Sequence, residues 1–139
     1  GLMAFSPAIN YVIIHDGARP LLPGKVMGNI IDNLKNYDAI TTGVKVKDTI
    51  KVKDKQSFVK ETLNRDKLMA IQTPQAFKYK LICKAHENCP RDLTATDDAS
   101  LVEALGHQVK IIKGSYQNIK VTTPEDLLYA EAILQSKKN

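Results

Sequence analysis

Two side chains of opposite charge, Asp16 and Arg19, closely follow a run of four apolar residues at positions 11–14. In an open α/β sheet, ligands bind beyond the carboxyl ends of the strands, so both side chains lie where a site is expected. An aspartate there can hold a metal ion or a sugar hydroxyl, and an arginine can bind a phosphate through two parallel hydrogen bonds. The alternative is an ion pair between the two residues that only closes the loop. Both interpretations are open at this point.

A lysine and two threonines add to these candidates. Lys120 precedes the predicted start of the last helix, at the same sheet edge as Asp16, although a lone lysine there is usually a solvated side chain. Thr73 lies in "QTPQ", which we expect to be either a rigid polar loop that presents its hydroxyl after a short strand or a turn with satisfied polar groups. Thr96, in "TDDAS", is predicted to be the N-cap of a helix, and structure alone explains that motif.

The elements that must position these residues follow from hydrophobic periodicity. Residues 11–14 are apolar without alternation, which is typical of a strand buried on both faces in a parallel sheet. A helix over 24–37 and a strand over 38–44 complete a strand–helix–strand unit with helices packed on the sheet, which makes the fold class α/β. The further predicted elements are a strand over 69–77, helices over 78–88 and 97–105, a strand over 107–114 and a helix that begins after Thr123.

Residues 48–63 differ in character from the rest of the chain. Apolar and charged residues alternate before and after "DKQS", which predicts a β-hairpin with one charged face that projects from the sheet. Residues 45–67 hold eight basic and four acidic residues, most of the excess behind the net charge of +5. Because Phe58 is the one aromatic residue of this segment, nucleic acid is the weaker interpretation, and a solvated arm or an anionic small-molecule site is the stronger one.

Composition excludes several classes of protein. With 139 residues and 43% hydrophobic content the chain can bury the core of one domain, and no apolar run approaches the length of a membrane span. The first residues lack the features of a signal peptide. Cys83 and Cys89 are not spaced as a metal or redox motif, so we expect reduced structural thiols in a cytoplasmic protein.

The order and content of the motifs together resemble one family. "HDGARP", "DTIK", "NRDKL", "QTPQAF", "TDDAS" and "NIKVTTPEDL" are similar, motif after motif, to the 2-C-methyl-D-erythritol 4-phosphate cytidylyltransferases. The resemblance implies a Rossmann-like three-layer α/β/α nucleotidyltransferase fold with a projecting β-hairpin arm, at residues 45–67, that mediates dimerisation. It implies an enzyme of isoprenoid precursor synthesis that joins the polyol phosphate to CTP, releases pyrophosphate and uses a divalent cation, usually Mg²⁺.

The resemblance also assigns roles to individual residues. It places Asp16 and Arg19 at the methylerythritol phosphate site, with Asp16 near the hydroxyls or the metal. Thr49 and Arg65 resemble arm residues that are delivered to the active site of a second subunit. We take the cations of Arg65 and Lys120 as the catalytic groups that grip and align the attacking phosphate. The further substrate-binding candidates are Thr96, by resemblance, and Thr73 of the polar loop.

One feature of the family is not found in this chain. Its glycines are scattered, and no Gly-rich loop that could cradle the CTP phosphates is present. We therefore expect residues 1–139 to be the C-terminal portion of a single nucleotidyltransferase domain, inactive toward CTP on its own. The alternatives are a ribitol 5-phosphate cytidylyltransferase and a non-catalytic dimerising module that binds phosphorylated ligands.

Overall fold

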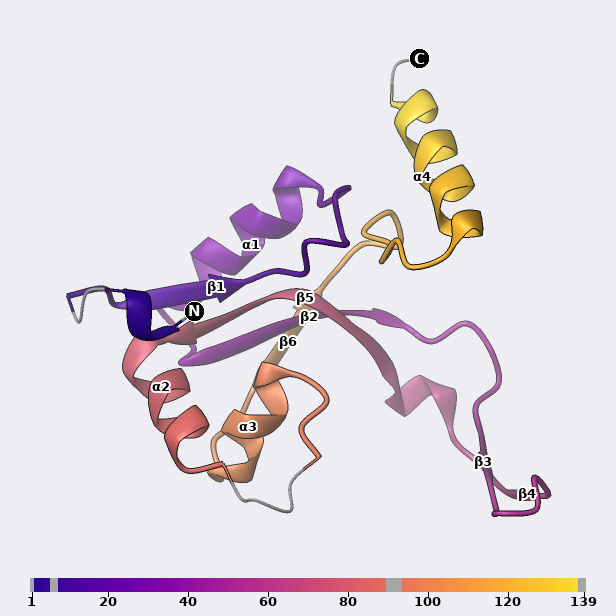
Figure 1. Cartoon of the computed structure of the whole chain (residues 1–139), viewed down its shortest axis with the longest axis horizontal. Helices are drawn as coiled ribbons and strands as arrows, with labels where there is room; N and C mark the ends of the chain where they lie inside the picture. The colour runs from indigo at the N-terminus through magenta and orange to yellow at the C-terminus, as the bar shows by residue number, and fades with distance from the viewer. Residues whose placement is uncertain (1, 6–7, 90–93, 138–139) are drawn as a thin grey trace.

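The centre of the fold is a four-stranded mixed sheet (Figure 1). The structure is a computed structural model that describes residues 2–5, 8–89 and 94–137. The strands lie in the order β1-β5-β2-β6 and span Tyr11–Ile14, Met69–Lys78, Ala39–Lys45 and Lys110–Lys113 respectively. The helices are α1 (Gly24–Leu34), α2 (Tyr79–Glu87), α3 (Asp98–Ala104) and α4 (Pro124–Ser136), with short 3₁₀ turns at Leu2–Ala4 and Arg65–Lys67.

Strand direction places three carboxyl ends at the same end of the sheet. Strands β1 and β2 both pair with β5 in the antiparallel sense, and β2 pairs with β6 in the parallel sense. Strands β1, β2 and β6 therefore run in the same direction. The loops that follow them lie at the same end of the sheet. The expectation of a parallel strand buried on both faces was wrong for β1. This strand is an edge of the described sheet, its described neighbour β5 is antiparallel, and Val12 is its only buried residue.

Helices cover the two faces of the sheet and make three layers. Neighbouring residues of β5 point to opposite faces, so Ala76 packs with Val26 and Ile30 of α1, while Phe77 packs with Ile82 of α2 and Val102 of α3. Figure 1 shows α1 on one side of the sheet and α2 and α3 on the other. The predicted α/β/α layering is therefore confirmed. None of the helices in the described ranges combines the length and the apolar composition that a membrane span requires.

The segment around Thr73 differs from its prediction. Instead of a loop after a short strand, Gln72–Gln75 belong to the ten-residue strand β5. The β2 register shifts between Ile40 and Thr42, opposite this segment, and the irregularity accommodates Pro74, which has no N–H to donate. Gln72 is hydrogen-bonded to Ser115 and Gln75 to Asp97, so this polar segment can lie inside the sheet.

The hairpin arm forms as predicted and is separate from the main sheet. Strands β3 (Lys51–Lys53) and β4 (Val59–Thr62) pair only with each other among the described strands, and Figure 1 shows them away from the core. Phe58 and Val59 are 71% and 63% exposed. A two-stranded hairpin is marginally stable by itself, and the rest of the described chain does not cover these two side chains.

Helix termini follow their local signals closely. Thr123 and Asp126 form a capping box at the start of α4, and Pro124 occupies the first helical position, as predicted. At α3 the N-cap is Asp97, whose side chain accepts a hydrogen bond from the Ser100 N–H, so the prediction of Thr96 as N-cap was wrong by one residue. Asp97 is equally able to cap, because its carboxylate reaches the same backbone donor.

Gly106 and Gly28 provide a matched test of the backbone. Gly106 ends α3 with φ 80°, a left-handed conformation, whereas Gly28 lies inside α1 with nothing within 4 Å of an added Cβ. Gly106→Ala should lower the free energy of unfolding by about 1 kcal/mol because a Cβ is strained there. Gly28→Ala should raise it by up to about 1 kcal/mol because alanine favours the helix. Urea denaturation measures both, and changes of the same sign would contradict the structure.

Candidate active site

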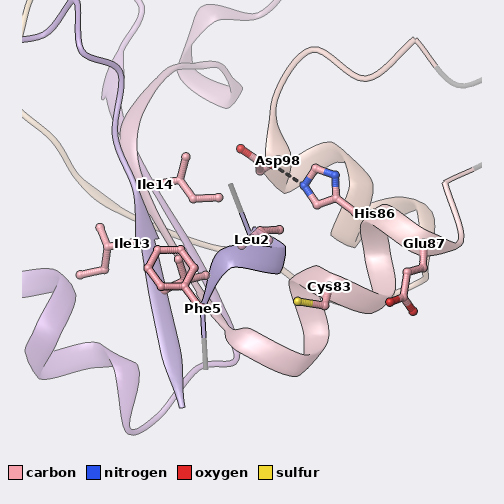
Figure 2. A pocket seen from close by; sticks show the side chains of 9 residues that line it. Leu2, Phe5, Ile13, Ile14, Cys83, His86, Glu87 and Asp98 are labelled. Carbon is pink, nitrogen blue, oxygen red and sulfur yellow. Dashed lines mark hydrogen bonds and ion pairs between the residues drawn. The ribbon is translucent and has the colours of Figure 1, made fainter. Parts of the chain in front are cut away.

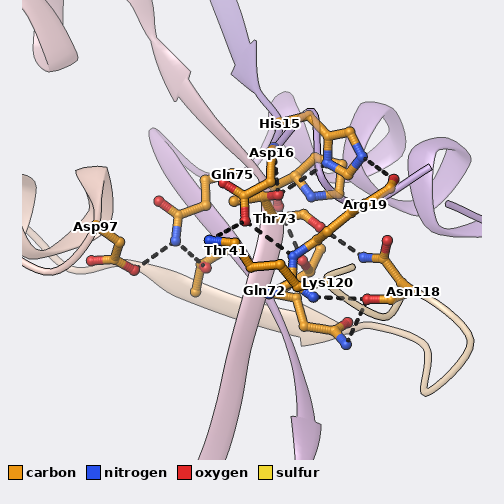
Figure 3. Close-up of polar contacts among 12 residues, drawn as sticks. His15, Asp16, Arg19, Thr41, Gln72, Thr73, Gln75, Asp97, Asn118 and Lys120 are labelled. Atoms are coloured by element: carbon orange, nitrogen blue, oxygen red, sulfur yellow. Dashed lines mark hydrogen bonds and ion pairs between the residues drawn. The ribbon is translucent and has the colours of Figure 1, made fainter. Parts of the chain in front are cut away.

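A polar pocket of about 420 Å³ lies at the carboxyl end of β1 and contains Asp16, Arg19 and Lys120. The Arg19 Nε donates to Asp16 Oδ2 at 3.2 Å, and Lys120 Nζ lies 3.3 Å from the same oxygen (Figure 3). A backbone hydrogen bond from the Val121 N–H to the Ala18 carbonyl holds the two chain segments side by side. Asp97 and Asp98 also line the pocket, but they are bonded to Gln75, to the Ser100 N–H and to His86. Arg19 and Lys120 are therefore the groups in this cluster that can attract an anion.

The charge state of Asp16 follows from its neighbours. Burial raises the pKa of this carboxyl, but the hydrogen bonds and charges of Lys120 and Arg19 outweigh burial and hold the pKa below its ordinary value of 3.8. Asp16 is therefore an anion at neutral pH. It can accept hydrogen bonds from hydroxyl groups, and it repels a phosphate from its own position toward the cations.

Asp16 should make the free energy of unfolding depend on pH. Because its pKa is lower in the folded than in the unfolded chain, the charged carboxylate stabilises the folded state above the unfolded value and loses this effect as the pH falls. We expect Asp16→Asn to lower the free energy of unfolding most near neutral pH and progressively less below about pH 4. Urea denaturation across pH 3–7 checks this, with Asp54→Asn on the exposed hairpin as a control. A pH-independent difference would contradict it.

His15, Thr73 and Asp16 form a chain of hydrogen bonds that holds the loop after β1. The Asp16 N–H donates to Thr73 Oγ1 at 2.9 Å, and His15 Nδ1 lies 3.0 Å from the same oxygen. His15 Nε2 lies 3.0 Å from the Arg19 carbonyl, which can only accept. With a proton on Nε2 the ring donates to that carbonyl, and the Thr73 hydroxyl can donate to Nδ1. Thr73 therefore positions the loop through its hydroxyl, which donates to His15, accepts from the Asp16 N–H and keeps one lone pair for a further donor.

A second polar group fixes the start of α3 against the sheet. Gln75, which is 1% exposed, donates to Thr41 Oγ1 at 2.9 Å and to Asp97 Oδ2 at 2.7 Å, and it accepts from the Ala99 N–H at 3.1 Å. Thr96 and Asp97 thereby line the polar pocket beside Asp16. Figure 3 shows this glutamine between Asp97 and Thr41.

The described residues do not fit a complete metal site. No group of three or more His, Cys, Asp or Glu side chains in the described ranges is placed to hold a metal ion. Asp16, the predicted ligand, already accepts two cationic neighbours at one oxygen. We therefore assign no metal ligand and derive no reaction step through a metal.

A larger hollow of about 630 Å³ lies beside β1 but carries little chemistry (Figure 2). Its lining is mainly apolar, with Leu2, Phe5 and Ile14 among its side chains, and Cys83, which is half-buried, also borders it. In its lining, His86 Nε2 is hydrogen-bonded to Asp98 Oδ1 at 2.8 Å. Because convergent polar groups fix the orientation of a polar ligand, the smaller pocket is the better candidate.

Thr49 and Arg65 lie apart from the polar pocket within one chain. Neither belongs to the lining of that pocket, and both are exposed residues of the hairpin segment. Arg65 donates from NH1 to the Lys47 carbonyl at 2.9 Å, and Lys47 Nζ lies 4.1 Å from the centre of the Tyr116 ring. These contacts fix the base of the arm and leave its residues outside the site of their own chain.

Comparison with known proteins identifies the family of this chain. A family model described as 2-C-methyl-D-erythritol 4-phosphate cytidylyltransferase matches residues 1–136. Relatives with that name include one from Pelotomaculum thermopropionicum, 48% identical over 99% of this chain and 58% of its own length. Another, from Geobacillus thermodenitrificans, is 53% identical over 91% of this chain and 55% of its own length. The chain belongs to this family.

A solved structure supports the fold of this cytidylyltransferase family member. The crystal structure of 4-diphosphocytidyl-2C-methyl-D-erythritol synthase from Anaerococcus prevotii superimposes with a TM-score of 0.88 and 40% identity. The superimposed region covers 96% of this chain and 63% of the Anaerococcus prevotii chain. The chain thus spans a little over half the length of the curated relatives given above.

Within the family framework, the structure brings together most of the predicted residues. Asp16, Arg19, Thr73, Thr96 and Lys120 all line one pocket, although they come from four separate segments of the chain. The motifs "HDGARP", "QTPQ" and "NIKVTTPED" also contain side chains that support these residues and for which the sequence predicted no individual role. Those side chains are His15, Gln72, Gln75 and Asn118. A polar side chain next to an apolar strand indicates that such a residue has a hydrogen-bond partner, but it does not indicate which residue that partner is.

Proposed function

We propose that this chain forms the part of a 2-C-methyl-D-erythritol 4-phosphate cytidylyltransferase that binds the polyol phosphate and aligns it with CTP. The observation that carries the proposal is the cluster of Asp16, Arg19 and Lys120 in one pocket of a chain that belongs to this family. An anionic carboxylate beside two cations suits a ligand with hydroxyl groups at one end and a phosphate at the other.

The proposed reaction is an in-line displacement. A phosphate oxygen of the polyol phosphate attacks the α-phosphorus of CTP, and the bond from that phosphorus to the departing pyrophosphate breaks. The attacking oxygen is already an anion, so no general base is needed. The protein contributes by holding the attacking phosphate in place and by neutralising charge as two anions approach each other.

Each residue has a distinct proposed task. Lys120, 50% exposed at its side chain, releases Asp16 and turns to the phosphate when the substrate enters. Arg19, only 12% exposed, stays against Asp16, whose second oxygen accepts the polyol hydroxyls. Thr96 and Thr73 border the same space. We assign no residue to CTP, and we propose that the divalent cation implied by the family resemblance binds chiefly to the nucleotide phosphates.

The arm is proposed to complete the site of a second copy. The hairpin exposes Ile50, Phe58 and Val59, which a partner subunit would cover, and it carries Thr49 and Arg65 outside their own pocket. We expect sedimentation of the intact protein to give a dimer at tens of micromolar, and a monomer would contradict this part of the proposal. A cytoplasmic location stays a prediction from the sequence.

A pyrophosphate-release assay tests the proposed activity. The intact protein, with CTP and Mg²⁺, should release pyrophosphate when methylerythritol phosphate is added and far more slowly with ribitol 5-phosphate. Activity with ribitol 5-phosphate alone would favour the sister reaction. Binding of methylerythritol phosphate without any release of pyrophosphate would favour a non-catalytic module.

A further inference from the structure

Two buried amide side chains, Gln72 and Asn118, lie next to the charged cluster and connect β5 to the segment that carries Lys120 (Figure 3). Gln72 is 8% exposed and Asn118 is fully buried. Neither carries a charge, and the reaction proposed above gives neither of them a task. Asn118 nevertheless contacts one cation of the pocket, Arg19, through its backbone carbonyl, and the other cation, Lys120, follows two residues later in the chain.

Gln72 pairs with the 114–118 loop much as a neighbouring strand would. Its Nε2 donates to the Ser115 carbonyl at 3.0 Å and lies 3.4 Å from the Asn118 carbonyl, and its Oε1 accepts from the Ser115 N–H at 3.3 Å. The loop approaches so closely that a Cβ at Gly114 would come within 2.5 Å of Gln72 Oε1. This side chain therefore sets the height of the loop above the sheet.

Asn118 binds to both sides of the site. Its side-chain Nδ2 donates to the Thr73 backbone carbonyl at 2.7 Å. Its backbone carbonyl accepts a hydrogen bond from Arg19 Nη1 at 2.8 Å. The Asn118 Oδ1 is buried without a hydrogen-bond partner. This unsatisfied acceptor offsets only part of the stability that the hydrogen bond to the Thr73 carbonyl contributes. The side chain also fixes geometry, because the carbonyl that orients Arg19 belongs to the residue that this side chain anchors.

On the basis of the proposed function, we infer that Gln72 and Asn118 are positioning residues that hold Arg19 and Lys120 where a phosphorylated polyol can meet both. Lys120 lies two residues beyond Asn118, in the segment bound to the loop of Asp16. If Asn118 loses its anchor on β5, both the acceptor for Arg19 and the start of the Lys120 segment move together. The protein then keeps the positive charges of Arg19 and Lys120 but loses the distance between them that the phosphorylated polyol requires.

A matched pair of variants separates positioning from stability. Asn118→Ala removes one buried hydrogen bond to the carbonyl of Thr73. Thr42→Val removes one buried hydrogen bond, 3.1 Å long, to the carbonyl of Pro74, the residue after Thr73, and Thr42 does not line the polar pocket. We expect similar decreases in melting temperature for the two variants. Gln72→Leu is a second positioning variant, which keeps the test informative if Asn118→Ala does not fold.

The first measurement needs no ligand. In proton–nitrogen NMR spectra, the Arg19 Nε–H should exchange with water at least about tenfold faster in Asn118→Ala or Gln72→Leu than in the unaltered protein or Thr42→Val. An unchanged exchange rate in the positioning variants overturns the inference, whatever the protein catalyses.

The second measurement concerns the reaction. The KM for methylerythritol phosphate should rise about tenfold in the positioning variants, as expected for a weakened charge-assisted contact, while the KM for CTP changes less than about twofold. Equal effects on both substrates, or equal effects of Thr42→Val, overturn a positioning role. If the unaltered protein releases no pyrophosphate, the proposed function fails, and the NMR result still decides whether these amides hold Arg19.

Discussion

Lys120→Ala is expected to lower kcat/KM for methylerythritol phosphate by about a hundredfold or more in the intact protein. The lysine supplies one of the two cations in the pocket, and its Nζ lies 3.3 Å from the Asp16 carboxylate that the ligand must share. Its side chain is 50% exposed, so its ion pair contributes little to stability and the fold should survive the substitution. Pyrophosphate release measures the rate, and the melting temperature reports on the fold.

Lys78 provides a control of the same kind. Its side chain is 49% exposed and its Nζ lies 2.8 Å from Asp38, so it has the same exposure and the same type of ion pair as Lys120. It does not line the polar pocket. Lys78→Ala should therefore leave kcat/KM within about twofold. A near-normal rate in Lys120→Ala, or an equal loss in both variants, would remove Lys120 from the proposed reaction.

Arg65→Ala is expected to have a comparable effect, at least about a hundredfold on kcat/KM, although Arg65 lies outside the pocket of its own chain. The reason is the proposed delivery of its guanidinium to a partner subunit, where it would hold the attacking phosphate opposite Lys120. Because the side chain is exposed and makes one hydrogen bond to the Lys47 carbonyl, the subunit should stay folded.

Lys60→Ala is the matched control on the arm, since Lys60 is an exposed basic residue of β4. It should leave the rate close to normal and the dimer intact. Sedimentation of Arg65→Ala must also give a dimer, because loss of the dimer would remove activity for another reason. A normal rate in dimeric Arg65→Ala would show that the arm does not act in catalysis.

Local signals predicted much of this fold. The cap of α4 depends on Thr123, Pro124 and Asp126, which contact one another within four residues, so the sequence alone contains the information. The same is true of the turn at Gly106, where one backbone angle favours one residue type. The hairpin arm was also predictable, because alternation around a turn needs no knowledge of distant partners.

Long-range pairing set the limit of sequence reasoning. The polar residues Gln72 and Gln75 led to the prediction of a loop where the structure has a strand. Their partners are distant in sequence: Ser115 lies 43 residues from Gln72, and Asp97 lies 22 residues from Gln75. The direction of β5 was equally hidden, and with it the antiparallel pairing of β1. For the site, the end of β1 identified Asp16 and Arg19 from physical argument. The roles of Thr49 and Arg65 came only from the family resemblance, because nothing within one chain brings them to the pocket.

Mixed dimers test the central claim most directly, namely that cations from two copies of the chain meet around one polyol phosphate. Arg65→Ala and Lys120→Ala subunits, each inactive alone, are co-expressed with different affinity tags, and the pooled dimers are assayed. In a mixed dimer, one site receives both substitutions and the other receives neither, so the pool should regain about a quarter of normal activity. If the pool stays as inactive as the two parents, the residues do not act across the subunit interface, and the account is contradicted.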